Sequence, residues 1–165
     1  MVALAALTLG GCIAIPISGG GAPVQVTAAG AASCPATTEA ENARAAALVS
    51  QMRKAAGGGA VQPNAAAARA AAVQACNMAK SGRLAHTAMI GGPTMRLQMQ
   101  GRVSLVTAEN IGAGPRWSLD QVMRAWADSP SHAANLRNPL FGVVGVAQAV
   151  AADGKTVFWS AVLAN

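Results

Sequence analysis

The chain has 165 residues, enough for a single domain, and its 12 Lys and Arg against 6 Asp and Glu give a formal charge of +6. The basic residues are dispersed, and the chain has no Tyr, 2 Phe and 3 Trp. Nucleic-acid-binding domains usually carry a basic patch with aromatic residues for stacking. The composition therefore argues against a nucleic-acid partner and suits a protein that lies near anionic lipid or cell-wall polymer.

Residues 1–17 are uncharged and largely apolar, and the run is too short to span a bilayer comfortably. They are typical of the apolar part of an export signal, and because its usual basic start is missing we expect translation to begin upstream of Met1. Leu9-Gly10-Gly11-Cys12 resembles a bacterial lipobox, which predicts lipidation of Cys12 and anchoring in the membrane. Ordinary cleavage near Ala29-Gly30-Ala31 is the alternative. Both alternatives predict an extracytoplasmic protein, in the periplasm or outer envelope.

The chain contains three cysteines, an odd number. Under either alternative Cys12 is consumed or removed, which leaves Cys34 and Cys76. An oxidising compartment favours a disulfide between them, and two buried free thiols are the alternative. Such a bond would close a loop of about 40 residues, which chain-entropy models value at roughly 4 kcal/mol.

Residues 18–36 are rich in Gly, Ala, Pro, Ser and Thr without periodicity, which predicts a flexible tether before a domain over 37–165. Capping residues and glycine stops then predict helices. The expected elements are a helix from Thr37 or Thr38 to Lys54, a helix over 64–81, a helical turn over 95–99, a weak strand over 102–107, a helix from Ser118 to Pro130, and strands over 143–150 and 156–163 joined by an Asp153-Gly154 turn. Helices beside a small antiparallel sheet predict an α+β domain.

Three segments carry a family resemblance. The first comprises Met78-Ala79, Gly82 and Leu84-Ala85-His86; the second, over 108–114, reads AENIGAG; and the third, over 126–146, reads WADSPSHAANLRNPLFGVVGV. Together with Phe158-Trp159, their order and spacing resemble the CAP superfamily (cysteine-rich secretory proteins, antigen 5 and pathogenesis-related proteins). The resemblance implies a three-layer α-β-α sandwich with a small, mainly antiparallel sheet.

The resemblance also implies a site. Eukaryotic members typically have two His and two acidic residues lining a cleft, and His86, Glu109 and His132 match three of these four positions. Ser129 stands at the fourth, as in bacterial relatives, and Asn110 is expected to anchor the backbone at a turn beside Glu109. We expect the site to form from the ends of separate elements, after the second helix, after the weak strand and after the capped helix. Separate burial of three ionisable groups would be costly.

Two imidazoles and a carboxylate could bind Zn²⁺ or another divalent metal weakly, through His86, Glu109 and His132. The alternative is a hydrogen-bonded polar cluster without metal. A Ser–His nucleophile involving Ser129 or Ser131 is disfavoured, because the chain has no G-x-S-x-G elbow and a Ser near Pro is typical of a turn or cap.

The CAP fold hosts lipid binding, signalling, defence and disputed peptidase activity, so it does not fix the function. We predict an exported envelope protein that binds a small apolar ligand, a lipid or an envelope component at the cleft. A weak, metal-assisted hydrolase and a purely structural protein are the alternatives, and we expect binding rather than catalysis.

Overall fold

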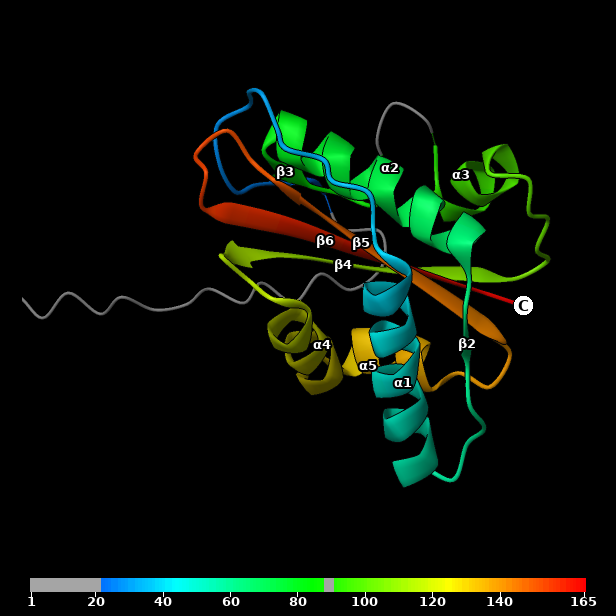
Figure 1. Ribbon diagram of the computed structural model, residues 1–165. Helices are drawn as coiled ribbons and strands as arrows, with labels where there is room; N and C mark the ends of the chain where they lie inside the picture. The colour runs from blue at the N-terminus through cyan, green and yellow to red at the C-terminus, as the bar shows by residue number, and fades with distance from the viewer. Residues whose placement is uncertain (1–21, 88–90) are drawn as a thin grey trace, which may run out of the picture.

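The computed structural model describes residues 22–87 and 91–165, so the predicted signal segment and Cys12 lie outside the described residues. The domain has three layers, as predicted (Figure 1). One face of a four-stranded sheet is covered by α1 (Glu39–Ala55), α4 (Leu119–Asp128) and α5 (Pro130–Arg137), and the other by α2 (Ala65–Ser81) and α3 (Pro93–Met99). No helix within 22–87 or 91–165 combines the length and apolar character that a membrane span needs.

The main sheet has the strand order β2-β5-β6-β4, which leaves β4 at one edge. Its strands are β2 (Gln62–Pro63), β4 (Thr107–Pro115), β5 (Val143–Val150) and β6 (Thr156–Ala164). Only the short β2 runs parallel to its neighbour, so the sheet is mainly antiparallel, as predicted. A second, two-stranded sheet pairs β1 (Val24–Gln25) with β3 (Arg83–Leu84).

The helix ends form for the reasons that the sequence indicated. The side chains of Thr38 and Asn64 cap α1 and α2. Ser118 and Gln121 form a capping box at the start of α4. Gly82 ends α2 in the left-handed region at φ +66°, and a Cβ there would lie 2.0 Å from the carbonyl oxygen of Thr27. Glycine is therefore required at this position both by the backbone conformation and by the space available.

The alanine-rich α2 packs unusually close to the sheet. Its inner face is lined by fully buried alanines, namely Ala67, Ala70, Ala71, Ala75 and Ala79. Opposite them on β5, a Cβ at Gly145 would lie 2.0 Å from the backbone nitrogen of Ala68. Small residues on both sides of this contact bring helix and strand together, and they set the position of the segment that follows α2.

One predicted boundary is wrong and one helix was not predicted, and both affect the site. The strand expected over 102–107 begins only at Thr107, and Val103 and Leu105 before it are 77% and 91% exposed. Among the described residues, no strand pairs with this apolar alternation. The helix that begins after Ser118 ends at Asp128, close to the predicted end at Pro130. Pro130 then opens a further helix, α5, which the sequence analysis did not predict, because proline fits the first turn of a helix, where its missing N–H is not needed. Glu109 is therefore inside a strand and His132 inside a helix.

The described part of the segment expected to be a tether, residues 22–36, lies against the domain. β1 pairs with β3, and Ser33 forms an antiparallel bridge with Val150. The predicted disulfide between Cys34 and Cys76 is confirmed, with the Cα atoms 5.4 Å apart. Backbone pairing and a covalent bond do not require periodic side chains, so composition alone did not indicate this attachment.

Candidate functional site

The candidate site lies at the edge of the sheet, where neighbouring residues of β4 serve opposite faces. Side chains alternate along a strand, so Glu109 and Asn110 point to different layers. Glu109 is bonded on the α2–α3 side and Asn110 on the α5 side. The site therefore comprises two polar groups, one on each side of the β4 edge.

On the first side, a buried carboxylate is surrounded by donors. Oε1 of Glu109 accepts hydrogen bonds from Arg96 Nη2 at 2.5 Å and from Ser160 Oγ at 3.0 Å. Oε2 lies 3.1 Å from Nδ1 of His86. The side chains of Glu109 and Arg96 are 1% and 0% exposed, and that of His86 is 23% exposed. The negative charge is thus compensated within the protein, as a buried charge must be.

Arg96 and Ser160 are the residues of this group that the sequence analysis missed, and Arg96 is the charged one. Besides the carboxylate, its guanidinium donates to the backbone oxygens of His86 and Gly91. The short helix α3 buries Arg96 and leaves Met95 and Met99 54% and 63% exposed. A hydrophobicity pattern places arginine toward solvent and methionine toward the core. Only the pairing with a buried carboxylate, which the sequence does not show, reverses that orientation.

On the second side, Asn110 attaches α5 to the sheet. Its Nδ2 donates to the backbone oxygen of His132 at 3.1 Å, and its Oδ1 accepts from Asn135 at 2.9 Å. Asn110 is fully buried. The expectation that it anchors backbone agrees with this geometry, but the position at a turn was wrong, because the residue lies within β4.

His132 is the least satisfied group of the site. Its Nδ1 lies 2.9 Å from Oγ of Ser129, one helical turn earlier. Its Nε2 is buried and has no hydrogen-bond partner among residues 22–87 and 91–165. Burial, and secondly the charge of His86, lower the pKa of His132 below its ordinary value of 6.5. The imidazole is therefore neutral at pH 7, with one ring nitrogen available to another group.

The three predicted site residues thus form one contacting pair and one separate residue. His86 and Glu109 are in direct contact, whereas His132 forms no hydrogen bond to either of them in the described structure. Adjacent positions on β4 connect the two sides, because Glu109 contacts the His86 ring and Asn110 bonds to the backbone oxygen of His132. Ser129 contacts the His132 ring.

The donor set does not match a zinc centre. Within the part of the chain that the structure describes, no group of three or more His, Cys, Asp and Glu side chains is placed to hold a metal ion. Both oxygens of Glu109 are engaged, and its contact with Nδ1 fixes the orientation of the His86 ring. The two imidazoles alone fall short of the three protein ligands usual for catalytic zinc. The metal interpretation remains a prediction, and we derive no chemistry from it.

Comparison with known proteins agrees with this architecture. The structure is similar to an outer surface protein from Borrelia burgdorferi, with 19% identity, a TM-score of 0.67 and coverage of 78% of this chain and 95% of that one. It is also similar to an extracellular protein containing an SCP domain from Bacillus anthracis, with 20% identity and a TM-score of 0.64, covering 78% and 44%. A cysteine-rich secretory protein from Staphylococcus aureus gives 18% identity and a TM-score of 0.57, covering 79% and 40%.

At these identities the structural neighbours establish the shared fold. A search of curated protein sequences found no match. The model of the cysteine-rich secretory protein (CAP) family matches residues 46–163, well over half of the chain. The segments expected to carry the resemblance, from the end of α2 to β6, fall within that range. The chain belongs to the CAP family of cysteine-rich secretory proteins.

Proposed function

We propose that this CAP domain acts outside the cytoplasm as a ligand-binding or interaction module, with its site at the β4 edge around His86, Glu109 and His132. The observation that carries the proposal is Nε2 of His132, a buried polar atom without a partner in the described structure. Buried polar groups are nearly always hydrogen-bonded, and an exception calls for an explanation. A bound ligand that contributes one polar atom would supply the missing partner.

The expected ligand is mainly apolar and carries a single hydroxyl or carbonyl group. A neutral imidazole can donate or accept at Nε2, depending on how Nδ1 shares its hydrogen bond with Ser129. The carboxylate of Glu109 is already compensated by Arg96 and His86. The site thus offers one polar contact, at His132, and little uncompensated charge. This combination favours a small apolar molecule or lipid over a multiply charged ligand.

The envelope location is supported by several independent features. Residues 1–17 resemble an export signal, and the disulfide between Cys34 and Cys76 suits an oxidising compartment. Two of the structural neighbours are titled an outer surface protein and an extracellular protein. Whether the chain is anchored through Cys12 or released after cleavage remains part of the proposal.

Hydrolysis is a weaker candidate on this geometry. As a general base, Glu109 would have to give up its contacts with Arg96 and Ser160. Ser129 contacts His132 from the N-cap position of α5, where its side chain forms no capping bond, and it lies in no G-x-S-x-G elbow that would expose a nucleophile. We therefore favour binding.

The proposal is tested on protein purified after native export. Mass spectrometry of its organic extract, beside metal analysis, is expected to find an apolar molecule in the wild type and to lose it in His132→Ala. Lys155→Ala, a change on the exposed β5–β6 turn, serves as the control and should retain the molecule. Thermal melts confirm that each variant is folded. A wild type with no bound molecule would leave the structural cluster as the better account.

A further inference from the structure

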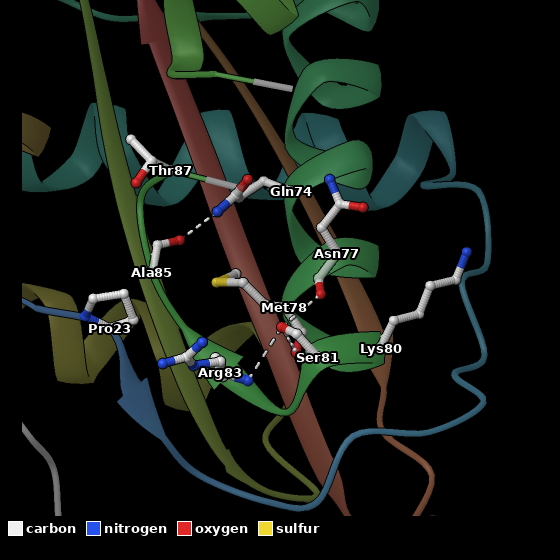
Figure 2. Close-up of a pocket in the computed structure, with 9 residues that line it drawn as sticks. All are labelled: Pro23, Gln74, Asn77, Met78, Lys80, Ser81, Arg83, Ala85 and Thr87. Carbon is white, nitrogen blue, oxygen red and sulfur yellow. Dashed lines mark hydrogen bonds between the residues drawn. The ribbon is translucent and has the colours of Figure 1, made fainter. Parts of the chain in front are cut away.

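A pocket of about 460 Å³ lies on the α2 side of the domain, next to the segment that carries His86. Figure 2 shows it between the last turns of α2, β3 and the segment that follows β3. It is lined by Pro23, Gln74, Asn77, Met78, Lys80, Ser81, Arg83, Ala85 and Thr87. Its volume is within the range of small-molecule sites, about 300–1,000 Å³. None of His86, Glu109 and His132 lines it, but Ala85 and Thr87 flank His86 in the chain, so the pocket adjoins the candidate site without including it.

The charged residues of this lining are both positive. Lys80 comes from α2 and Arg83 from β3, and no acidic residue is among the nine. In Figure 2 the two side chains extend on either side of Ser81. Neither has a salt-bridge partner within residues 22–87 and 91–165. Two cations without a counter-ion at one pocket favour an anionic ligand, since charge-assisted hydrogen bonds are the stronger ones.

Two amide side chains in the wall have unused hydrogen-bonding groups. Gln74 is fully buried, and its Nε2 donates to the backbone oxygen of Ala85 while its Oε1 has no partner in the described chain. Nδ2 of Asn77 also has none. Residues three positions apart share a helix face, so an acceptor and a donor lie close together just beneath the pocket surface. The N–H and C=O of an amide match this pair.

The remaining wall combines apolar side chains with the hydroxyls of Ser81 and Thr87. Its apolar part consists of Met78, which is 1% exposed and lies on the same turn of α2, with Pro23 and Ala85. Methionine adapts to ligands of varied shape because its side chain is flexible and polarisable. The pocket thus offers an apolar contact, an amide-matching pair and two cations.

We propose that this pocket binds a small carboxylate that carries an amide and an apolar group, such as an N-acylated amino acid. The carboxylate contacts Lys80 and Arg83, whose exposed side chains must turn toward each other to reach it. The amide bonds to Gln74 and Asn77, and the apolar group packs on Met78. The two unpartnered atoms are covered in this structure. Binding therefore requires rotation of the two amide groups about their terminal torsions, which are soft.

The test uses the isotope-labelled protein with its disulfide intact and N-acetyl-L-leucine as the probe. Titration is followed by the NMR signals of the Gln74 and Asn77 side-chain amides. Saturable shifts in both are expected. N-acetyl-L-leucinamide, which lacks the charge, and 4-methylpentanoate, which lacks the amide, should each bind about tenfold more weakly.

Matched variants separate the pocket from general electrostatics. Lys80→Gln/Arg83→Gln should weaken binding of N-acetyl-L-leucine at least about tenfold. Arg124→Gln/Lys155→Gln makes the same change in net charge at exposed positions outside the pocket and should leave the affinity unchanged. The proposal is overturned if the two amides show no saturable shift up to roughly 10 mM probe. It is also overturned if both double variants bind alike, or if 4-methylpentanoate binds as well as the probe.

Discussion

Replacing Arg96 by methionine is the sharpest perturbation of the candidate site. The substitution keeps a long, flexible side chain and leaves the buried carboxylate of Glu109 without its closest cation. It also removes the donor to the backbone oxygens of His86 and Gly91. Removing one partner of a buried ion pair costs about 3–5 kcal/mol, because the remaining charge stays buried and uncompensated. For a domain of this size that lowers the melting temperature by roughly 10 °C.

Urea unfolding followed by circular dichroism measures this loss of stability. Two further variants serve as controls for its cause. Arg96→Met/Glu109→Gln removes the orphaned charge and should recover a substantial part of the lost stability. Arg44→Met breaks an exposed ion pair with Asp120 at 2.8 Å and should cost at most about 1 kcal/mol. The reasoning is refuted if Arg96→Met is as mild as Arg44→Met, or if the double variant is no more stable than the single one.

Three further predictions concern the frame that carries the site. Cys34→Ser/Cys76→Ser should lower the free energy of unfolding by about 4 kcal/mol, measured in urea, because the unfolded chain loses a long closed loop; an unchanged value would contradict this. Gly145→Ala should destabilise by about 3 kcal/mol or more, because the added Cβ would meet the backbone of α2 at 2.0 Å, whereas Gly142→Ala, with open space, should be nearly neutral in the same thermal melts. Similar costs for the two glycines would contradict the close approach of α2 to the sheet. The pKa of Asp153 is lowered to about 2, mainly by the hydroxyl and the backbone N–H of Thr156. Its carboxyl ¹³C signal in NMR should therefore still be that of the ionised form at pH 3. A titration midpoint near pH 4 would contradict those hydrogen bonds.

Much of the fold could be predicted because its signals are local. Thr38 and Asn64 cap the helices that they were expected to cap, and Gly82 ends α2. The Asp153-Gly154 turn joins the two predicted strands β5 and β6. In each case the physical cause lies within a few residues of its effect.

The remainder depends on contacts between distant segments. The alternation before Thr107 looked like a strand, but the partner β6 begins to pair only from that residue onward. Pro130 is compatible both with the end of one helix and with the start of another. The residues around it do not show that a second helix follows. At the site, His86, Glu109 and His132 were indicated by resemblance, whereas Arg96 was not, because its role depends on a carboxylate on another element.

His132 also makes stability depend on pH. Because its pKa is lowered in the folded state, mainly by burial, the unfolded chain binds the proton more readily. The stability due to the neutral imidazole is complete above about pH 6.5 and is lost as the pH falls from there toward the folded pKa. In His132→Gln, unfolding between about pH 7 and 5 should therefore depend less on pH than in the wild type. An unchanged slope would contradict a buried, neutral His132.

The central proposal is that His86 and His132 belong to one site at the edge of β4, together with Glu109. Histidine ring signals followed by NMR against pH test it directly, since the chain has only two histidines and single substitutions assign them. The account predicts that His132 titrates below its ordinary value of 6.5, and that its pKa rises in His86→Gln, because a nearby positive charge is removed. A pKa of His132 at or above 6.5, or one that His86→Gln leaves unchanged, would contradict the proposed site.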